Sequence, residues 1–171
     1  MHLDIRGLPI STASAEAAAA FDHLVKGYLT FRADTPDRLA ALLEADADFA
    51  LAHCMKGYFA MLAFKQAVVP VALQAARTAQ SLAADATQRE RDHVAALTAW
   101  ANGELDGAIG TWESILRAHP NDAVAFRLAH FVNFWLGRPS GHGRLGRACD
   151  SGVVGRHPEL FVDPRLPLLR P

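Results

Sequence analysis

The stretch TQRERDHVAALTAWANGELDGAIGTWESILRAHPNDAVAFRLAHFVNFWLG, residues 87–137, decides the fold. Thr87 and Glu90 open it with the T-x-x-E spacing of a capping box, in which the two side chains bind backbone N–H groups at the start of a helix. Asn102 and Gly103 form a pair that commonly ends a helix. The spacing therefore predicts a helix between Thr87 and Asn102.

Two further helices follow within the same stretch. Apolar residues at helical spacing extend over about residues 105–118 and stop before Pro120, which interrupts the pattern. Asn121 and Asp122 are residue types whose side chains accept hydrogen bonds from the first turn of a helix. They predict the start of a helix that runs as far as residues 136–137.

The helical pattern also covers the chain upstream of residue 87. Alanine, the strongest helix former, accounts for 32 of the first 137 residues. Proline occurs there only at positions 9, 36, 70 and 120, which fit helix boundaries. Four helices are expected, at Ala15–Phe31, at residues 36–45 with Thr35 as N-cap, at Asp48–Phe64 and at Val69–Ala84.

About seven helices joined by short connections favour an all-α fold of stacked antiparallel hairpins. Placing the 34-residue tetratricopeptide pattern with its last proline on Pro120 puts the small residue on Ala108 and the large aromatic on Trp112. In an earlier copy, Gly57 falls where a glycine allows close helix contact. We therefore expect a right-handed, tetratricopeptide-like α-solenoid of three hairpins and one further helix. The alternative is an alanine-rich helical bundle without true repeats.

Composition excludes several classes of function. The formal charge of -1 shows no excess of the basic residues that nucleic-acid binding requires. No uncharged apolar run is long enough to cross a bilayer. Cys54 and Cys149 have no metal-ligand or disulfide spacing, which favours a reducing, cytoplasmic location. His53 and His130 have no second ligand one helical turn away. We expect no cofactor, metal, nucleic-acid or membrane site.

Two motifs carry a resemblance to a known family. They are the T-x-R-E-R-x-H stretch from Thr87 to His93 and the A-W-x-x-G-x-x-x-x-A-x-x-x-W-E stretch from Ala99 to Glu113. With these motifs, residues 4–139 resemble the N-terminal part of the tetratricopeptide repeat protein 38 family. The resemblance implies a helical-repeat protein of several hundred residues, with no assigned enzymatic activity, substrate or cofactor.

The sequence changes character after residue 137. Residues 138–171 contain one alanine, five glycines, five prolines and six arginines, and no apolar helical stripe survives. We expect a helical-repeat domain over residues 1–139 and an irregular tail over residues 140–171.

A natural linker is one explanation of this change in composition. A frameshift near Ser140 is the other, since synonymous codons read one nucleotide later recover helical sequence that resembles the family's continuation. The nucleotide sequence decides between them.

The expected function is that of a protein–protein interaction module. In a tetratricopeptide-type stack, the first helix of each hairpin lines a concave groove that holds a peptide or a partner helix. On this chain the offsets of the repeat assign the groove to Tyr58, Glu90, His93, Trp100, Arg127 and Phe131. Alternatively, Trp100 and Phe131 pack against neighbouring helices without contacting a partner.

A second function class is an inactive N-terminal fragment of a helical enzyme whose active groups lie in a missing C-terminal part. The charged stretch around His93 could handle protons, or it could be a charged first helical turn. The sequence has neither H-E-x-x-H nor G-x-S-x-G, so we assign no catalytic residue and expect no enzyme activity.

The last helix is expected to leave aromatic side chains uncovered. Phe126, Phe131, Phe134 and Trp135 are spread around more than half of its circumference, so they cannot all face the preceding helices. Leu160, Phe161, Leu166 and Leu168 of the tail could cover part of that face. Self-association through this helix is therefore expected.

Overall fold

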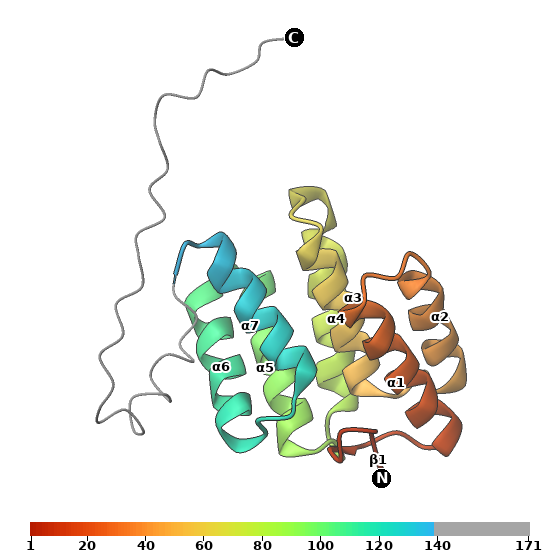
Figure 1. The fold of residues 1–171 in the computed structure, drawn as a ribbon. Helices are drawn as coiled ribbons and strands as arrows, with labels where there is room; N and C mark the ends of the chain where they lie inside the picture. The colour runs from red at the N-terminus through yellow and green to blue at the C-terminus, as the bar shows by residue number, and fades with distance from the viewer. Residues whose placement is uncertain (139–171) are drawn as a thin grey trace, which may run out of the picture. The chain divides into compact units, whose positions relative to one another are not determined.

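The computed structural model of the chain describes residues 1–138. The predictions of an irregular tail over residues 140–171, of a frameshift near Ser140 and of four apolar tail residues that cover the last helix all concern residues outside the described part of the chain. Within residues 1–138 the chain forms seven α-helices, one short 3-10 turn and a small hairpin (Figure 1). The helices are α1 (Ala15–Leu29), α2 (Thr35–Ala45), α3 (Ala50–Leu62), α4 (Val69–Leu82), α5 (Gln88–Ala101), α6 (Leu105–Ala118) and α7 (Ala123–Trp135), and the turn η1 (Gln66–Val68) precedes α4.

The N-terminal hairpin is absent from the expected fold. Strands β1 (His2–Leu3) and β2 (Pro9–Ile10) pair antiparallel, and Gly7 has a positive φ of 77° in the connection. The Asp4 carboxylate holds the turn by accepting hydrogen bonds from the backbone N–H groups of Arg6 and Leu8, both at 2.9 Å. The sequence predicts no helix before Ala15, and it gives no sign of these two strands. Two-residue strands are too short to produce an alternating apolar pattern.

The predicted helix starts are confirmed at α5 and α7 and corrected at α2. Thr87 and Glu90 form the complete capping box, and the Asp122 carboxylate accepts hydrogen bonds from the N–H groups of Val124 and Ala125. Thr35 is the first residue of α2 and not its N-cap, a position that Asp34 occupies. The Thr35 hydroxyl donates to the Arg32 carbonyl at 2.6 Å, so its side chain stabilises the turn before α2 and does not cap the helix.

Helices α1 and α3 each end two residues before the phenylalanine that the sequence predicts to be the last residue of the helix. Helices α1 and α3 stop at Leu29 and Leu62, and the predicted last residues, Phe31 and Phe64, have left-handed backbone with φ of 54° and 50°. After α1 the chain forms a Schellman motif, in which the N–H of Arg32 donates to the Gly27 carbonyl at 2.9 Å. Glycine is the usual residue at this position, which is why apolar periodicity misplaces both ends.

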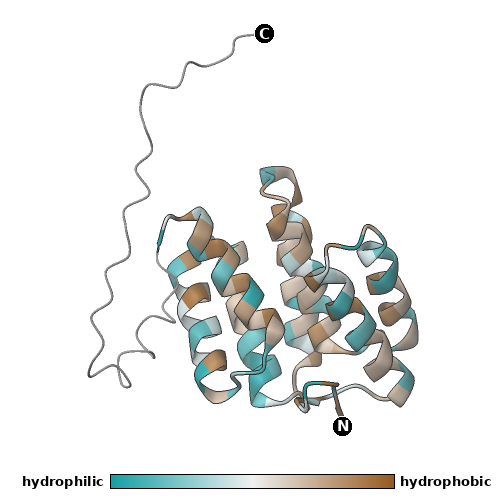
Figure 2. Cartoon of the chain, in the orientation of Figure 1, coloured by the Kyte–Doolittle hydropathy of each residue, from teal (hydrophilic) through white to brown (hydrophobic). Residues whose placement is uncertain are grey.

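Consecutive helices pack against one another as antiparallel neighbours (Figure 1). α1 contacts α2, α3 contacts α4 and α5 contacts α6, while α3 also packs against α5. Helix α7 packs on α6 and touches α1. Figure 2 shows both hydrophobic and hydrophilic residues on these helices, and the hydrophobic ones form a core between them.

Two predicted close contacts are confirmed in the core. A Cβ atom built on Gly57 would lie 2.4 Å from a methyl carbon of Leu97, so only glycine lets α3 approach α5 this closely. Ala108 and Trp112 are both fully buried, and the Trp112 ring lies edge-on to Trp100 at 5.4 Å between centroids. The small and large residues of α6 therefore have the complementary roles that the pattern predicts.

Candidate functional site

The six residues assigned to a groove have two different environments. Tyr58 on α3 and Glu90, His93 and Trp100 on α5 are buried, whereas Arg127 and Phe131 on α7 are partly exposed. The structure corrects the expectation for the first four, because their side chains lie in the interior and do not line an open surface. The alternative interpretation of Trp100 as a packing residue agrees with its contacts to Tyr58 and Trp112.

A buried polar network links three of the helices to the start of α7. Asp122 Oδ2 accepts a hydrogen bond from Arg89 Nη1 at 2.7 Å and lies 3.1 Å from His93 Nε2. On the other side of its ring, His93 Nδ1 lies 3.2 Å from the Tyr58 hydroxyl. That hydroxyl also accepts from Trp112 Nε1 at 3.2 Å and donates to the His93 carbonyl at 2.8 Å.

Charge balance in this network depends on Asp122. The Tyr58 hydroxyl donates its single proton to the His93 carbonyl. The His93 ring faces the same carboxylate as Arg89. Burial alone raises the pKa of Asp122, but His93 and Arg89 lower it more strongly, and the result lies well below the usual range. Asp122 therefore stays ionised at neutral pH.

The network contains the residue types of a proton relay, but its side chains are buried and connect helices to one another. We call this network the buried brace. Tyr58, His93, Arg89 and Asp122 are all buried, and their polar groups bind one another or the backbone. Within this network, Arg89 Nε is the one buried side-chain atom that lacks a hydrogen-bond partner among the described residues. Burial raises the pKa of the Tyr58 hydroxyl well above its ordinary value, so it remains a neutral donor. The arrangement therefore positions helices and leaves no face for a substrate.

The N-terminal segment completes the same brace. Glu90 Oε1 accepts a hydrogen bond from the backbone N–H of Ser11 at 2.9 Å, and Arg89 Nη2 donates to the Pro9 carbonyl at 3.1 Å. The T-x-R-E-R-x-H motif thus caps α5 and also binds residues 9–11 and the start of α7. The interpretation of this stretch as a charged first helical turn with Glu90 in its capping box is confirmed. It does not anticipate that Arg89, Glu90 and His93 are buried.

Exposed aromatic side chains gather where α1, α3 and α7 end, and we call Phe31, Phe64, Phe131, Phe134 and Trp135 the aromatic surface. Phe64 contacts both Phe131 and Trp135, with ring centroids 5.9 and 6.1 Å apart. Phe134 packs edge-on against Trp135 at 6.0 Å. Phe31, which is 78% exposed, is joined to this surface by Arg127, whose guanidinium lies 4.5 Å from its ring centroid. The exposure of Phe134 and Trp135 confirms that α7 leaves aromatics uncovered.

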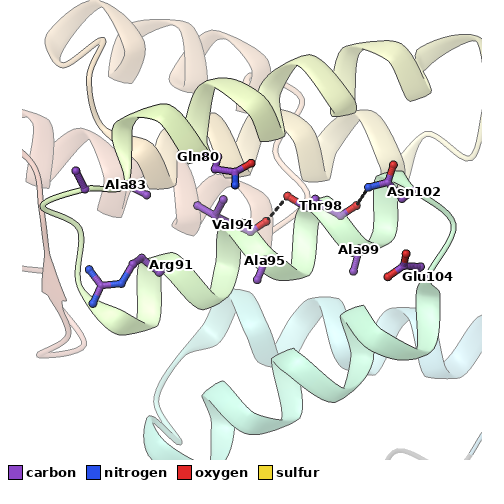
Figure 3. Close-up of a pocket in the computed structure, with 10 residues that line it drawn as sticks. Gln80, Ala83, Arg91, Val94, Ala95, Thr98, Ala99, Asn102 and Glu104 are labelled. Atoms are coloured by element: carbon purple, nitrogen blue, oxygen red, sulfur yellow. Dashed lines mark hydrogen bonds between the residues drawn. The ribbon is translucent and has the colours of Figure 1, made fainter.

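A groove runs along α5 between α4 and α6, with a volume of about 660 Å³ (Figure 3). Its floor is formed by Val94, Ala95 and Ala99 of α5, and one wall is formed by Gln80 of α4 and by Ala83, which follows α4. The two ends are charged. Arg91 lies at the N-terminal end of α5, and Glu104 follows the C-terminal end. We call this cavity the α5 groove.

Comparisons with known proteins give no family assignment. No protein-family model matches the chain, and no solved structure matches it either. In residues 1–138 no group of three or more His, Cys, Asp or Glu side chains is placed to hold a metal ion. None of the helices in this part of the chain has both the length and the apolar character that a bilayer span requires.

Proposed function

We propose that the chain is a protein–protein interaction module of the tetratricopeptide-repeat type, and that a partner binds at the aromatic surface. The observation that carries the proposal is the strained backbone beneath that surface. Phe31 and Phe64 both have positive φ, at 54° and 50°, although both side chains are exposed. A left-handed backbone at a residue other than glycine costs roughly 1–2 kcal/mol. Strain without burial indicates a role other than stability.

Helix packing supports the tetratricopeptide part of the proposal. Paired neighbours α1–α2, α3–α4 and α5–α6, together with the contact between α3 and α5, are the contacts that a stack of hairpins requires. Gly57, Ala108 and Trp112 have the packing roles that the repeat pattern predicts. The T-x-R-E-R-x-H motif, whose buried side chains connect the helices, is also one of the two stretches that carry the resemblance to the tetratricopeptide repeat protein 38 family.

The chemistry of the aromatic surface defines the kind of partner. Trp135, Phe134 and Phe64 are 64%, 69% and 59% exposed and offer flat apolar faces. Aromatic anchors of this kind dominate binding energy at protein interfaces. Arg127 lies beside them and can bind a carboxylate or a carbonyl at the edge. We therefore propose a partner protein or peptide that presents apolar side chains flanked by an acidic residue.

Quantitative co-purification with matched variants tests the proposal. The full chain, the double variant Phe134→Ser/Trp135→Ser and the control Val71→Ser are compared, because Val71 is exposed on α4 outside the aromatic surface. We expect a defined set of partners with the first chain and the control, and its loss with the double variant. Sedimentation velocity shows whether that partner is a second copy of the chain, as self-association through α7 predicts. Equal recovery with all three chains would contradict the proposal.

A further inference from the structure

The α5 groove differs from the aromatic surface because its two ends carry opposite charges. Its floor of small and apolar residues, Val94, Ala95 and Ala99, lies between a positive charge at one end and a negative charge at the other. The Arg91 guanidinium binds the Ala86 carbonyl just before α5, and Glu104 follows the C-terminal end of α5, so the two charges lie at the ends of a helix of 14 residues, which is about 21 Å long. An occupant that matches both charges is about four helical turns long.

Both charges lie at the surface, and neither forms an ion pair within residues 1–138. Arg91 is exposed, and its guanidinium donates to the Ala86 carbonyl and to Gln88 Oε1, which are neutral oxygens that hold the group in place without neutralising it. Glu104 is exposed at the N-cap position of α6, where its side chain makes no capping hydrogen bond. The groove therefore presents a fixed cation and an uncommitted carboxylate.

The two charges favour one direction of binding. Figure 3 shows α4 and α6 running antiparallel to α5. A helix that lies over α5 can run parallel or antiparallel to it, and the charges of Arg91 and Glu104 select the parallel direction. Its first turn then lies near Arg91 and its last turn near Glu104. Acidic residues in a first turn and basic residues in a last turn also stabilise a helix by themselves.

We propose that the α5 groove binds an α-helical segment of a partner protein, about four turns long, that runs parallel to α5. The segment has an acidic residue in its first turn, a basic residue in its last turn and an apolar face between them. The small side chains Ala95 and Ala99 let its backbone approach closely, and the polar groups of Gln80 and Asn102 lie at the rim. This site is separate from the aromatic surface and does not depend on the function proposed there.

Two synthetic peptides of 17 residues test the proposal directly. Both are stapled to equalise their helicity and carry the same Leu and Ala face, but one has Glu in the first turn and Lys in the last, and the other has these charges exchanged. Fluorescence anisotropy measures their binding to the full chain at low salt. We expect the Glu-first peptide to bind about tenfold more tightly, because two exposed charge pairs change from attraction to repulsion between the peptides.

Variants of the full chain complete the design. Arg91→Glu/Glu104→Arg should reverse the preference, so that the Lys-first peptide binds more tightly. Ala95→Trp should abolish binding of both peptides, whereas Ala40→Trp, at an exposed position of α2, should leave it unchanged. Circular dichroism of each variant establishes that the fold is retained. No detectable binding of the Glu-first peptide, equal affinities of the two peptides, or undiminished binding to Ala95→Trp would each overturn the proposal.

Discussion

Replacement of Asp122 by asparagine isolates the charge at the centre of the buried brace. Asparagine has the same shape and is as good an N-cap as aspartate, so the hydrogen bonds from Val124 and Ala125 to Oδ1 can persist. The change removes the negative charge that faces Arg89 and His93, and it replaces the acceptor Oδ2 by an amide NH2 group, which is a donor. Arg89 is only 3% exposed and cannot reach water in place of its lost partner.

The expected destabilisation follows from that burial. Removing one partner of a buried ion pair costs about 3–5 kcal/mol, because the remaining charge is left uncompensated. Domains are stable by only about 5–15 kcal/mol, so this single change removes a large part of the free energy of unfolding. For a domain of this size the melting temperature should fall by roughly 10–20 °C.

Urea and thermal unfolding followed by circular dichroism measure the effect. Asp106→Asn is the matched control, since Asp106 and Arg138 form an ion pair whose side chains are 78% and 50% exposed. We expect the control to change stability by about 1 kcal/mol or less. Arg89→Gln should rescue part of the loss when combined with Asp122→Asn, because no unpaired charge then remains. A loss below about 1 kcal/mol for Asp122→Asn would refute the reasoning.

Three further predictions concern glycine packing, backbone strain and pH. Gly57→Ala should destabilise the chain by about 1–3 kcal/mol in urea unfolding, because the new methyl group would collide with Leu97. Its control Gly110→Ala, with no atom within 4 Å of the added Cβ, should stabilise the chain by about 0.5–1 kcal/mol, and the opposite order would contradict the packing argument. Phe31→Gly should leave stability unchanged within about 1 kcal/mol, since relief of the left-handed backbone offsets the lost contact with Arg127, whereas Phe31→Ala should be less stable than Phe31→Gly. Asp122 has a lowered pKa, so its contribution is complete above the unfolded value of about 3.9 and is lost as the pH falls below it. Burial raises the pKa of Tyr28 to about 12, so its contribution is complete below about pH 10 and is lost as the pH rises toward 12. Unfolding free energies measured across the pH range should show both losses in the parent chain, and the acid loss should be smaller in Asp122→Asn.

Helix positions could be predicted because each start and stop depends on local chemistry. The capping box of Thr87 and Glu90 and the N-cap Asp122 are signals contained within four residues, and both are confirmed. Gly57 could be predicted as a close contact because the repeat pattern places a glycine there. The ends at Phe31 and Phe64 could not, since phenylalanine continues an apolar pattern and gives no sign of left-handed backbone.

The environment of the predicted groove residues depends on tertiary contacts that no local signal contains. One signal could nevertheless have indicated that the motif is buried. Arg89, His93 and Trp100 lie at helical spacing on the face of α5 that also bears the buried Ala96, so the apolar stripe continues through the charged residues. Charged residues in line with an apolar stripe are buried only with partners, and these partners, Asp122 and Pro9, are distant in sequence.

The attachment of the N-terminal hairpin has a consequence for the order of assembly. Contacts between successive helices are local, whereas Ser11 to Glu90, Pro9 to Arg89 and Arg6 to Asn121 join residues 79, 80 and 115 positions apart. Closing a loop of about 80 residues costs roughly 2 kcal/mol more than closing one of about 10. During synthesis the hairpin emerges before α5, and it cannot dock on α5 until that helix has left the ribosome. Within residues 1–138 we therefore expect fast amide exchange in residues 1–12, and Glu90 becomes shielded from water only after both α5 and the hairpin are in place.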